Sequence, residues 1–246
     1  MSRMIDVHCH LLPKVDDGSK SWEMSLAMCD VAKADGITHI VCTPHANDEY
    51  KYDRAEHQKT LDELQRRITN GLTISLGCDF HFSYDNIQAA IANPDNYLIA
   101  GGDYLLVELS DFAMSPAIFT ALEKLVAMGI RPIITHPERN MMLQRHADDV
   151  LRFAQKGCAI QITANSFTGH WGEGSRKMAH WLLERHAVHI IASDAHDPKF
   201  RPPVMSQARD VVVKAFGHDV AQACVEQNPA AIIAGEPLPW FPAPRT

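Results

Sequence analysis

Apolar, strand-like runs in this chain repeatedly end on a side chain that can bind a metal ion. Six such runs occupy residues 4–7, 37–43, 72–76, 104–107, 131–135 and 189–193. The histidines and acids that follow them are His8, His10, His45, Asp79, Glu108, His136, Asp194 and His196. A polar group after one buried strand is common, but this recurrence of imidazoles and carboxylates needs a shared cause. The pattern predicts that the strand ends meet at one multinuclear metal site.

Helical patterns separate the strand-like runs, which predicts an α/β fold with a parallel sheet. We expect a further strand at residues 158–163 and helices at residues 21–34, 54–70, 118–128, 146–156, 175–185 and 205–216. An open doubly wound sheet uses the same strand and helix units. Side chains from many strands converge on one point only at the carboxyl end of a barrel, so seven strands with these ligands favour a closed or nearly closed barrel.

Length and composition fit one domain. The chain has 246 residues, of which 46% are hydrophobic and 22% charged, and barrels often reach about 200 to 250 residues without splitting. We therefore expect a single domain over residues 1–246. Its proline-rich end, residues 237–246, is expected to lie extended on the surface with Trp240 and Phe241 packed against it, and a partner-docking role for this tail is the alternative.

Charge and cysteine usage restrict the partners and the compartment. The formal net charge of −7 argues against nucleic acid or an anionic membrane as the main partner, because both attract clustered Lys and Arg. No apolar stretch is long enough to span a bilayer, and the first residues lack the apolar region of a signal peptide. The six cysteines contain no C-x-x-C pair. We expect buried free thiols in a cytoplasmic protein.

His8 and His10 form the first half of the predicted site. They are two residues apart on an expected strand, so both imidazoles point to one face and Cys9 points to the other. Structural packing is the alternative for two histidines on a strand. Asp17 follows within one turn, where an ordinary Asx turn with glycine is the alternative.

Asp194 and His196 repeat the two-residue spacing after a run too apolar to be solvated. A helix cap is the alternative for Asp194. A lone ionised carboxylate at Glu108 would be costly to bury unless cations balance its charge. The remaining histidines are expected on strands, helices or the surface, except His81 and His170, which stay open.

Five histidines and four carboxylates are more ligands than one ion takes, since such cations use about four to six protein and water ligands. The nine candidates are His8, His10, Asp17, His45, Asp79, Glu108, His136, Asp194 and His196. Two or three ions are therefore expected. A nitrogen and oxygen set without thiolate fits Mn, Fe or Zn.

Two arginines lie close to these ligands in sequence. Arg139 follows His136, and Arg201 follows His196. Arginine recognises phosphate through a planar fork, and adjacent cations can activate water for an in-line phosphoryl displacement. Hydrolysis of a phosphate ester is the natural use of this set, with a surface ion pair as the alternative for each arginine. Residues 47–52 and 165–174 are expected to be rim loops that contact substrate, with an ordinary connection as the equal alternative for each.

Short motifs follow one another in order from Met4 to about Asn228. They are Met-Ile-Asp-Val-His-Cys-His, Val-Asp-Asp-Gly, Thr-Pro-His, Leu-Val-Glu-Leu, Thr-His-Pro-Glu-Arg, Gln-Ile-Thr-Ala-Asn-Ser, Ala-Ser-Asp-Ala-His and Arg-Pro-Pro-Val-Met. Together they resemble the polymerase and histidinol phosphatase (PHP) superfamily, and within it the capsule-associated bacterial protein tyrosine phosphatases.

This resemblance implies a distorted (β/α)7 TIM-like barrel with its metal site at the carboxyl ends of the strands. It implies a trinuclear centre that usually works with manganese, and hydrolysis of phosphotyrosine on a partner tyrosine kinase that controls capsule or exopolysaccharide assembly. By matching motif, Arg139 and Arg201 would hold the phosphate. The ligands would be His8, His10, Asp17, His45, Glu108, His136, Asp194 and His196.

One position departs from the family pattern. Where the family usually has glutamate, this chain has Asp79, which is one methylene shorter. The third ion is then expected to bind more weakly, to shift, or to recruit water or His81. The other route to phosphotyrosine hydrolysis, a C-x5-R cysteine motif, is absent after all six cysteines, which excludes a nucleophilic cysteine.

Three other functions compete with a tyrosine phosphatase. A histidinol-phosphatase-like enzyme of the same superfamily would share every ligand and differ only in its rim loops. An amidohydrolase also uses H-x-H on a barrel, but here the strand before Glu108 carries no lysine and the strand at residues 158–163 no histidine. The third is a metal-bound regulatory subunit that docks a kinase without catalysis.

Overall fold

The computed structural model describes residues 3–111 and 115–245. Every strand pairing in it is parallel. The strand segments form two sheets, with the orders β1-β2-β4 and β3-β5-β6-β7-β8-β9. Their bounds are β1 Met4–Cys9, β2 Ile37–Cys42, β3 His45–Ala46, β4 Thr73–Leu76, β5 Asp79–His81, β6 Tyr104–Glu108, β7 Arg131–Thr135, β8 Ala159–Thr163 and β9 Ile190–Ala192.

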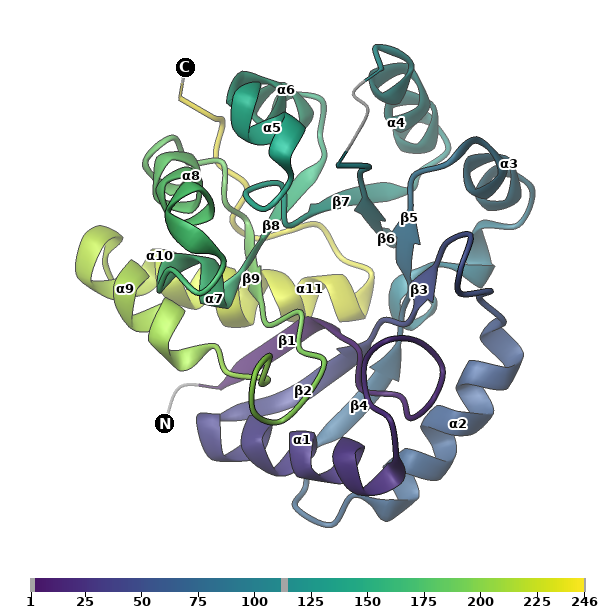
Figure 1. The fold of residues 1–246 in the computed structure, drawn as a ribbon. Helices are drawn as coiled ribbons and strands as arrows, with labels where there is room; N and C mark the ends of the chain where they lie inside the picture. The colour runs from purple at the N-terminus through teal and green to yellow at the C-terminus, as the bar shows by residue number, and fades with distance from the viewer. Residues whose placement is uncertain (1–2, 112–114, 246) are drawn as a thin grey trace.

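The two sheets are parts of one distorted barrel, as predicted (Figure 1). Thr43 and Pro44 separate β2 from β3, and Gly77 and Cys78 separate β4 from β5, so two of the seven expected strands are each followed by a short second segment that was not predicted. The remaining seam lies between β1 and β9, where Cys9 pairs with Ala195 in a parallel bridge. A backbone hydrogen bond from Asp194 N to His8 O (2.8 Å) lies beside that bridge and joins the first strand to the last.

Helices surround the strands (Figure 1). The first of them, α1, begins after Ser21, whose hydroxyl accepts a hydrogen bond from Met24 N, and ends at Gly36 with φ 95°, as its cap residues predict. The helices are α1 Trp22–Asp35, α2 Arg54–Arg67, α3 Tyr84–Ala92, α4 Ala117–Ala127, α5 Met141–Arg145, α6 Ala147–Gln155, α7 Ala164–Phe167, α8 Gly172–Glu184, α9 Ser206–Phe216, α10 His218–Gln222 and α11 Asn228–Ala234, with shorter helical turns at Pro94–Asn96, Ile99–Gly101 and Ala223–Gln227.

The prediction that residues 165–174 form a loop was wrong in part, because only residues 168–171 lie outside a helix. The segment contains most of α7 and the start of α8, because Ala164 and Phe167 bury their side chains and draw the chain into a helical turn. The helices α3 and α5 were also not predicted. Both begin at a polar cap, Ser83 and Asn140, whose side chains accept backbone hydrogen bonds.

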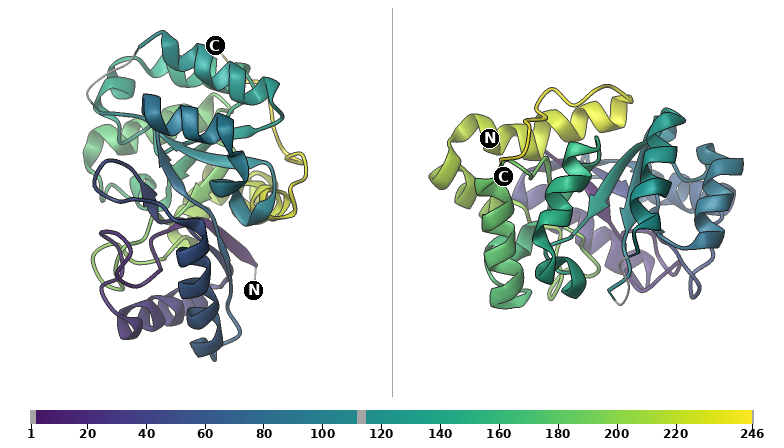
Figure 2. Two further views of the ribbon diagram at one scale, coloured as in Figure 1. Left: turned by 90° about the vertical axis from the view of Figure 1, so that its right-hand side faces the viewer. Right: turned by 90° about the horizontal axis from the view of Figure 1, so that it is seen from above.

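The core has two parts on either side of the strands. The larger part lies between the strands and the surrounding helices. The smaller one fills the barrel with residues such as Val7, Leu106 and Ile133, and Ile232 of α11 closes it at the amino ends of the strands. Figure 2 shows α11, in yellow, across one end of the strands. The carboxyl ends of the strands, at the opposite end, are not covered by α11.

The C-terminal tail packs against this closed end. The amide of Asn228 donates to the carbonyls of His189 (2.8 Å) and Trp240 (2.7 Å), and the Phe241 ring stacks on His189 with the centroids 4.2 Å apart. The predicted packing of Trp240 and Phe241 is therefore confirmed.

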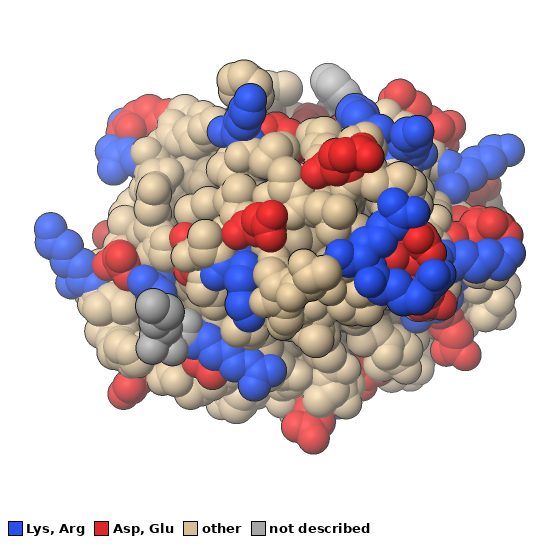
Figure 3. Space-filling model, turned by 90° about the horizontal axis from the view of Figure 1, so that it is seen from below, with Lys and Arg blue, Asp and Glu red and all other residues tan. Residues whose placement is uncertain are grey.

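The surface mixes both charge signs. On the face seen from below Figure 1, lysines and arginines are interspersed with acids (Figure 3). The ion pairs of the molecule include Arg67 with Glu63 (2.7 Å). Among the described helices, none has both the length and the apolar character that crossing a membrane requires.

Candidate metal centre

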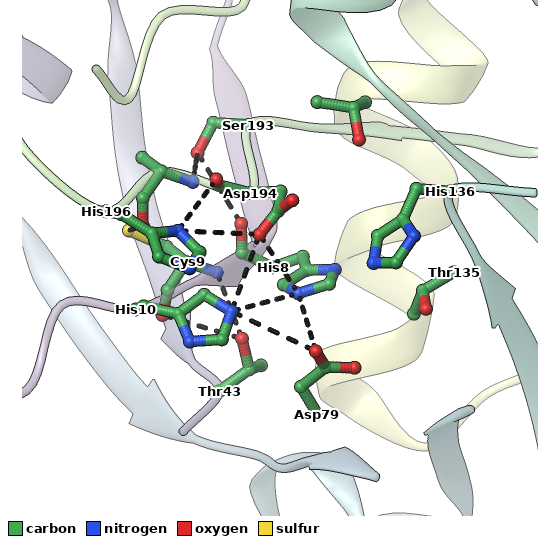
Figure 4. Close-up of polar contacts among 12 residues, drawn as sticks. His8, Cys9, His10, Thr43, Asp79, Thr135, His136, Ser193, Asp194 and His196 are labelled. Carbon is green, nitrogen blue, oxygen red and sulfur yellow. Dashed lines mark hydrogen bonds and ion pairs between the residues drawn. The ribbon is translucent and has the colours of Figure 1, made fainter. Parts of the chain in front are cut away.

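The centre of the site is formed by the end of β1 and the segment after β9 (Figure 4). The Nε2 atoms of His8 and His10 are 3.3 Å apart. Oδ1 of Asp194 lies 3.5 Å from the first of these nitrogens and 3.4 Å from the second. All three side chains are buried. Their ligand atoms lie close enough together to hold one cation.

Two buried oxygens orient these imidazoles. Oε1 of Gln161, on β8, lies 2.9 Å from Nδ1 of His8, and Oδ2 of Asp16 lies 2.8 Å from Nδ1 of His10. An oxygen acceptor places the ring proton on Nδ1 and leaves Nε2 free to bind a cation. Asp16 is thus more than part of an Asx turn.

A second group lies toward the mouth of the site. Oδ1 of Asp17 is 3.4 Å from Nε2 of His45 and 3.3 Å from Nε2 of His196, and His10 completes the group. The turn that carries Asp17 requires glycine at Gly18, because a Cβ there would lie 2.3 Å from the carbonyl oxygen of His10.

Asp79 connects the remaining ligands. Its Oδ2 lies 3.1 Å from Nδ1 of His45 and 3.5 Å from Nε2 of His8. Glu108 approaches His45 (3.9 Å) and Nε2 of His136 (3.7 Å). Two further groups result, His8 with Asp79 and His136, and His45 with Asp79 and Glu108. The structure therefore brings together all nine predicted ligands. His81 approaches Glu108 (3.6 Å) but joins none of the four groups found among the described residues.

The chemistry of this set fits bound cations. Asp79 is fully buried, yet neither carboxylate oxygen has a hydrogen-bond partner among the described groups, which is costly for an ion unless a cation compensates it. Burial alone would lower the pKa of His45, but the carboxylates of Asp17, Asp79 and Glu108 outweigh burial and raise this pKa to about 11. The acids thus create a strongly negative potential at the imidazoles, which metal ions would neutralise.

Two ligand positions are strained. His136 has φ 31° and Asp194 has φ 50°, in the left-handed region that costs a non-glycine residue about 1–3 kcal/mol. His136 directly follows the end of β7, and Asp194 lies two residues after the end of β9. Strain of this kind is typical of functional sites.

Arg139 and Arg201 meet at the same carboxylate. Arg139 Nη1 donates to Oδ2 of Asp194, and Arg201 Nη2 donates to the same oxygen at 2.8 Å. Asp194 therefore faces the imidazoles with Oδ1 and the arginines with Oδ2. A phosphate held by the two guanidiniums would lie beside the candidate ions.

A cavity of about 240 Å³ opens beside this arrangement. Its lining combines Glu108, His136 and Arg139 with the apolar side chains of Leu109, Leu143 and Trp171. The cavity therefore offers an apolar wall close to the charged groups.

Sequence reasoning missed four residues that complete the site, Asp16, Gln161, Glu138 and Trp171. Glu138 is fully buried and joins the ends of β7 and β8 by accepting from Thr163 N (3.0 Å) and Ser166 Oγ (2.6 Å). A polar Gln161 inside an apolar run was a usable signal. Trp171 lies in the segment 165–174 that was expected to contact substrate, but no local pattern singled it out within that segment.

Comparison with known proteins decides the family. Residues 4–234 match the family described as capsular polysaccharide synthesis, CpsB/CapC. The chain belongs to the CpsB/CapC family. One curated CpsB/CapC relative is the tyrosine-protein phosphatase CpsB of Streptococcus pneumoniae, which is 30% identical over 239 residues, or 94% of this chain and 98% of the relative.

Solved structures agree with this family membership. One solved structure comes from the crystal structures of YwqE from Bacillus subtilis and CpsB from Streptococcus pneumoniae, which are metal-dependent tyrosine phosphatases. It matches this chain with a TM-score of 0.92 and 28% identity, over 98% of this chain and 98% of its own. The dihydropyrimidinase of Brevibacillus agri has a TM-score of 0.57 at 12% identity, covering 95% of this chain and 71% of its own. The second likeness extends the fold beyond the CpsB/CapC family and carries no activity.

Proposed function

We propose that this chain is a metal-dependent phosphatase that hydrolyses phosphotyrosine on a partner protein. Membership of the CpsB/CapC family supports this function, as do relatives named tyrosine-protein phosphatases. The observation that carries it is the convergence of nine nitrogen and oxygen ligands with two arginines at Asp194. The phosphorylated partner is proposed to be an autophosphorylated bacterial tyrosine kinase that controls capsule or exopolysaccharide assembly.

The resident metal is proposed to be manganese, in two or three ions, with iron or zinc as alternatives. The ligands would be the nine side chains grouped above, and the donor set of imidazoles and carboxylates without thiolate supports a metal of this class. When bound, such ions supply an activated water and neutralise charge on the phosphate. Asp79 belongs to two of the four groups. We therefore include it among the metal ligands, although its side chain is one methylene shorter than glutamate.

The protein's own residues bind and orient the phosphate ester. Arg139 and Arg201 would hold the equatorial oxygens through charge-assisted hydrogen bonds, and Asp194 fixes both guanidiniums beside the imidazoles. The tyrosyl oxygen would leave with little help, because its hydroxyl pKa of about 10 makes it a tolerable leaving group.

Cysteine chemistry does not compete with this mechanism. All six cysteines are free and buried. Burial raises the thiol pKa of Cys9, Cys42 and Cys78 well above its ordinary value, so these thiols stay protonated and are poor nucleophiles.

The cytoplasmic location expected from the sequence stays a prediction.

The function is tested by metal content and phosphopeptide kinetics on one purified sample. We expect manganese to support hydrolysis of a phosphotyrosine peptide. His136→Ala should lower turnover at least about 100-fold, as removal of a group central to catalysis does, and should leave the fold intact by circular dichroism. Exposed His218 provides the control, and His218→Ala should retain the parent rate.

Competing substrates separate the alternatives. Faster turnover of histidinol phosphate than of the phosphopeptide would favour a small-molecule phosphatase. Hydrolysis of a dihydropyrimidine without that of p-nitrophenyl phosphate would favour an amidohydrolase. Unchanged turnover in His136→Ala would reject the proposed site.

A further inference from the structure

The two arginines at Asp194 share one aromatic neighbour, Trp171. The guanidinium carbon of Arg139 lies 3.9 Å from the centroid of the Trp171 ring, and that of Arg201 lies 5.0 Å from it. Trp171 directly precedes α8, whereas the arginines follow β7 and β9. One ring therefore contacts cations from two other strand–helix connections.

This arrangement must hold two like charges close together. The side chains of Arg139 and Arg201 are only 20% and 23% exposed, so solvent screens their repulsion in part. Both donate to a single oxygen of Asp194. Arg139 also donates to Thr163 Oγ1 (3.4 Å) and Arg201 to the carbonyl of Asp194 (3.1 Å), in each case through the nitrogen that already bonds Asp194. Bonds made through one nitrogen do not fix the plane of a guanidinium that has five donors. The negative face of an indole attracts cations within about 6 Å and supplies the missing restraint.

Hydrogen bonding does not explain where the Trp171 ring lies. Its Nε1 is buried and donates to no group among the described residues, although a buried indole N–H usually has a partner. The ring interacts with the two guanidiniums and lies at 80° to the His170 imidazole, with 5.3 Å between the centroids. The π face is the part of Trp171 that the site uses.

We propose that Trp171 is a positioning residue that orients Arg139 and Arg201 for phosphate binding. The inference rests on the proposed function and deepens it by naming the group that prepares the phosphate site. Trp171, Arg139 and His136 line the same cavity. The Arg139 guanidinium that the ring orients therefore lies at the cavity beside the predicted ligand His136. Preorganised donors bind phosphate more tightly than mobile ones.

The test measures phosphate affinity apart from turnover. In the manganese-loaded protein we expect Trp171→Ala to weaken inorganic phosphate binding about ten-fold by calorimetry, as loss of two cation–π contacts predicts. We expect kcat/KM for a phosphotyrosine peptide to fall by a similar factor. Metal content and the thermal unfolding midpoint report whether the metal centre and the fold survive.

Three further variants distinguish orientation from packing. Trp171→Phe keeps a π face and should restore phosphate affinity to within about three-fold of the parent. Trp171→Leu fills space without a π face and should stay close to the alanine variant. Trp181 on α8 is the matched control, because the guanidinium carbon of Arg185 lies 4.0 Å from the centroid of its ring. Trp181→Ala should bind phosphate as the parent does.

Parent-like phosphate affinity in a folded Trp171→Ala protein would overturn the inference. So would equal rescue by leucine and phenylalanine, which would assign the effect to packing. A parent protein that binds phosphate but leaves phosphotyrosine intact would reject the proposed function and still allow the role of Trp171 to be measured by phosphate affinity.

Discussion

At the residue scale, the metal centre depends on the oxygens that bond the imidazoles as well as on the imidazoles themselves. His8 and His10 each use Nδ1 to contact a buried oxygen, of Gln161 and Asp16 respectively. The opposite nitrogens then face each other and the carboxylate of Asp194. A ligand identified by residue type becomes a usable one only when its ring is held in the correct tautomer.

Gln161→Leu tests this role. The variant removes the acceptor from Nδ1 of His8 and keeps an apolar group of similar size in a fully buried position. We expect manganese affinity to fall about 10–100-fold, as measured by titration of the metal-free protein. Gln65 on α2 is the control, because its amide forms its hydrogen bonds with backbone groups away from the site. Equal losses in Gln161→Leu and Gln65→Leu would argue against an orienting role.

At the scale of elements, the barrel depends on one seam. The first and last strands join where Cys9 pairs with Ala195. Asp6 of β1 supports this seam from inside, because its buried carboxylate accepts hydrogen bonds from Ser193 N (3.0 Å) and Ser193 Oγ. Burial raises the pKa of Asp6 to about 6 in spite of these bonds. The ligands His8, His10, Asp194 and His196 flank the bridge of this seam on both strands.

Ser193→Ala is expected to weaken this closure. It leaves the Asp6 carboxylate with one donor fewer, which should lower the free energy of unfolding by about 1–3 kcal/mol. Urea unfolding at pH 8, where the carboxylate is ionised, measures the change. Thr60 on α2 is partly exposed and, among the described residues, its hydroxyl bonds the carbonyl of Glu56, so Thr60→Ala should change stability by less than about 0.5 kcal/mol. A seam variant as stable as this control would contradict the expectation.

At the scale of the whole molecule, the tail and the barrel meet at His189. Its Nδ1 accepts a hydrogen bond from Ile160 N (3.0 Å), and its ring stacks on Phe241. Burial lowers the pKa of His189 to about 3, so the folded protein keeps this ring neutral. The end of the barrel opposite the metal centre thus depends on an uncharged imidazole.

Stability should therefore depend on pH through His189. Its folded-state pKa lies below the ordinary value of about 6.5, so its contribution is present above pH 6.5 and is lost as pH falls toward 3. Between pH 8 and pH 5.5, we expect the parent to lose about 1.4 kcal/mol more unfolding free energy than His189→Asn. Urea unfolding at both pH values tests this. Exposed His218→Ala should follow the parent, and a parallel loss in His189→Asn would show that the ring titrates normally.

The local sequence determined the seven main strands, their parallel arrangement and the residue types of the nine candidate ligands, because strand periodicity and residue chemistry are short-range properties. That residues 1–246 form one domain stays a prediction. Tertiary structure alone decided the contacts that give those residues their roles, such as His8 with Gln161, 153 positions away, and Arg139 with Asp194, 55 positions away. It also turned part of an expected rim loop into helix and placed Trp171 against both arginines. Such contacts arise when the barrel closes, and no local pattern encodes which distant side chains then meet.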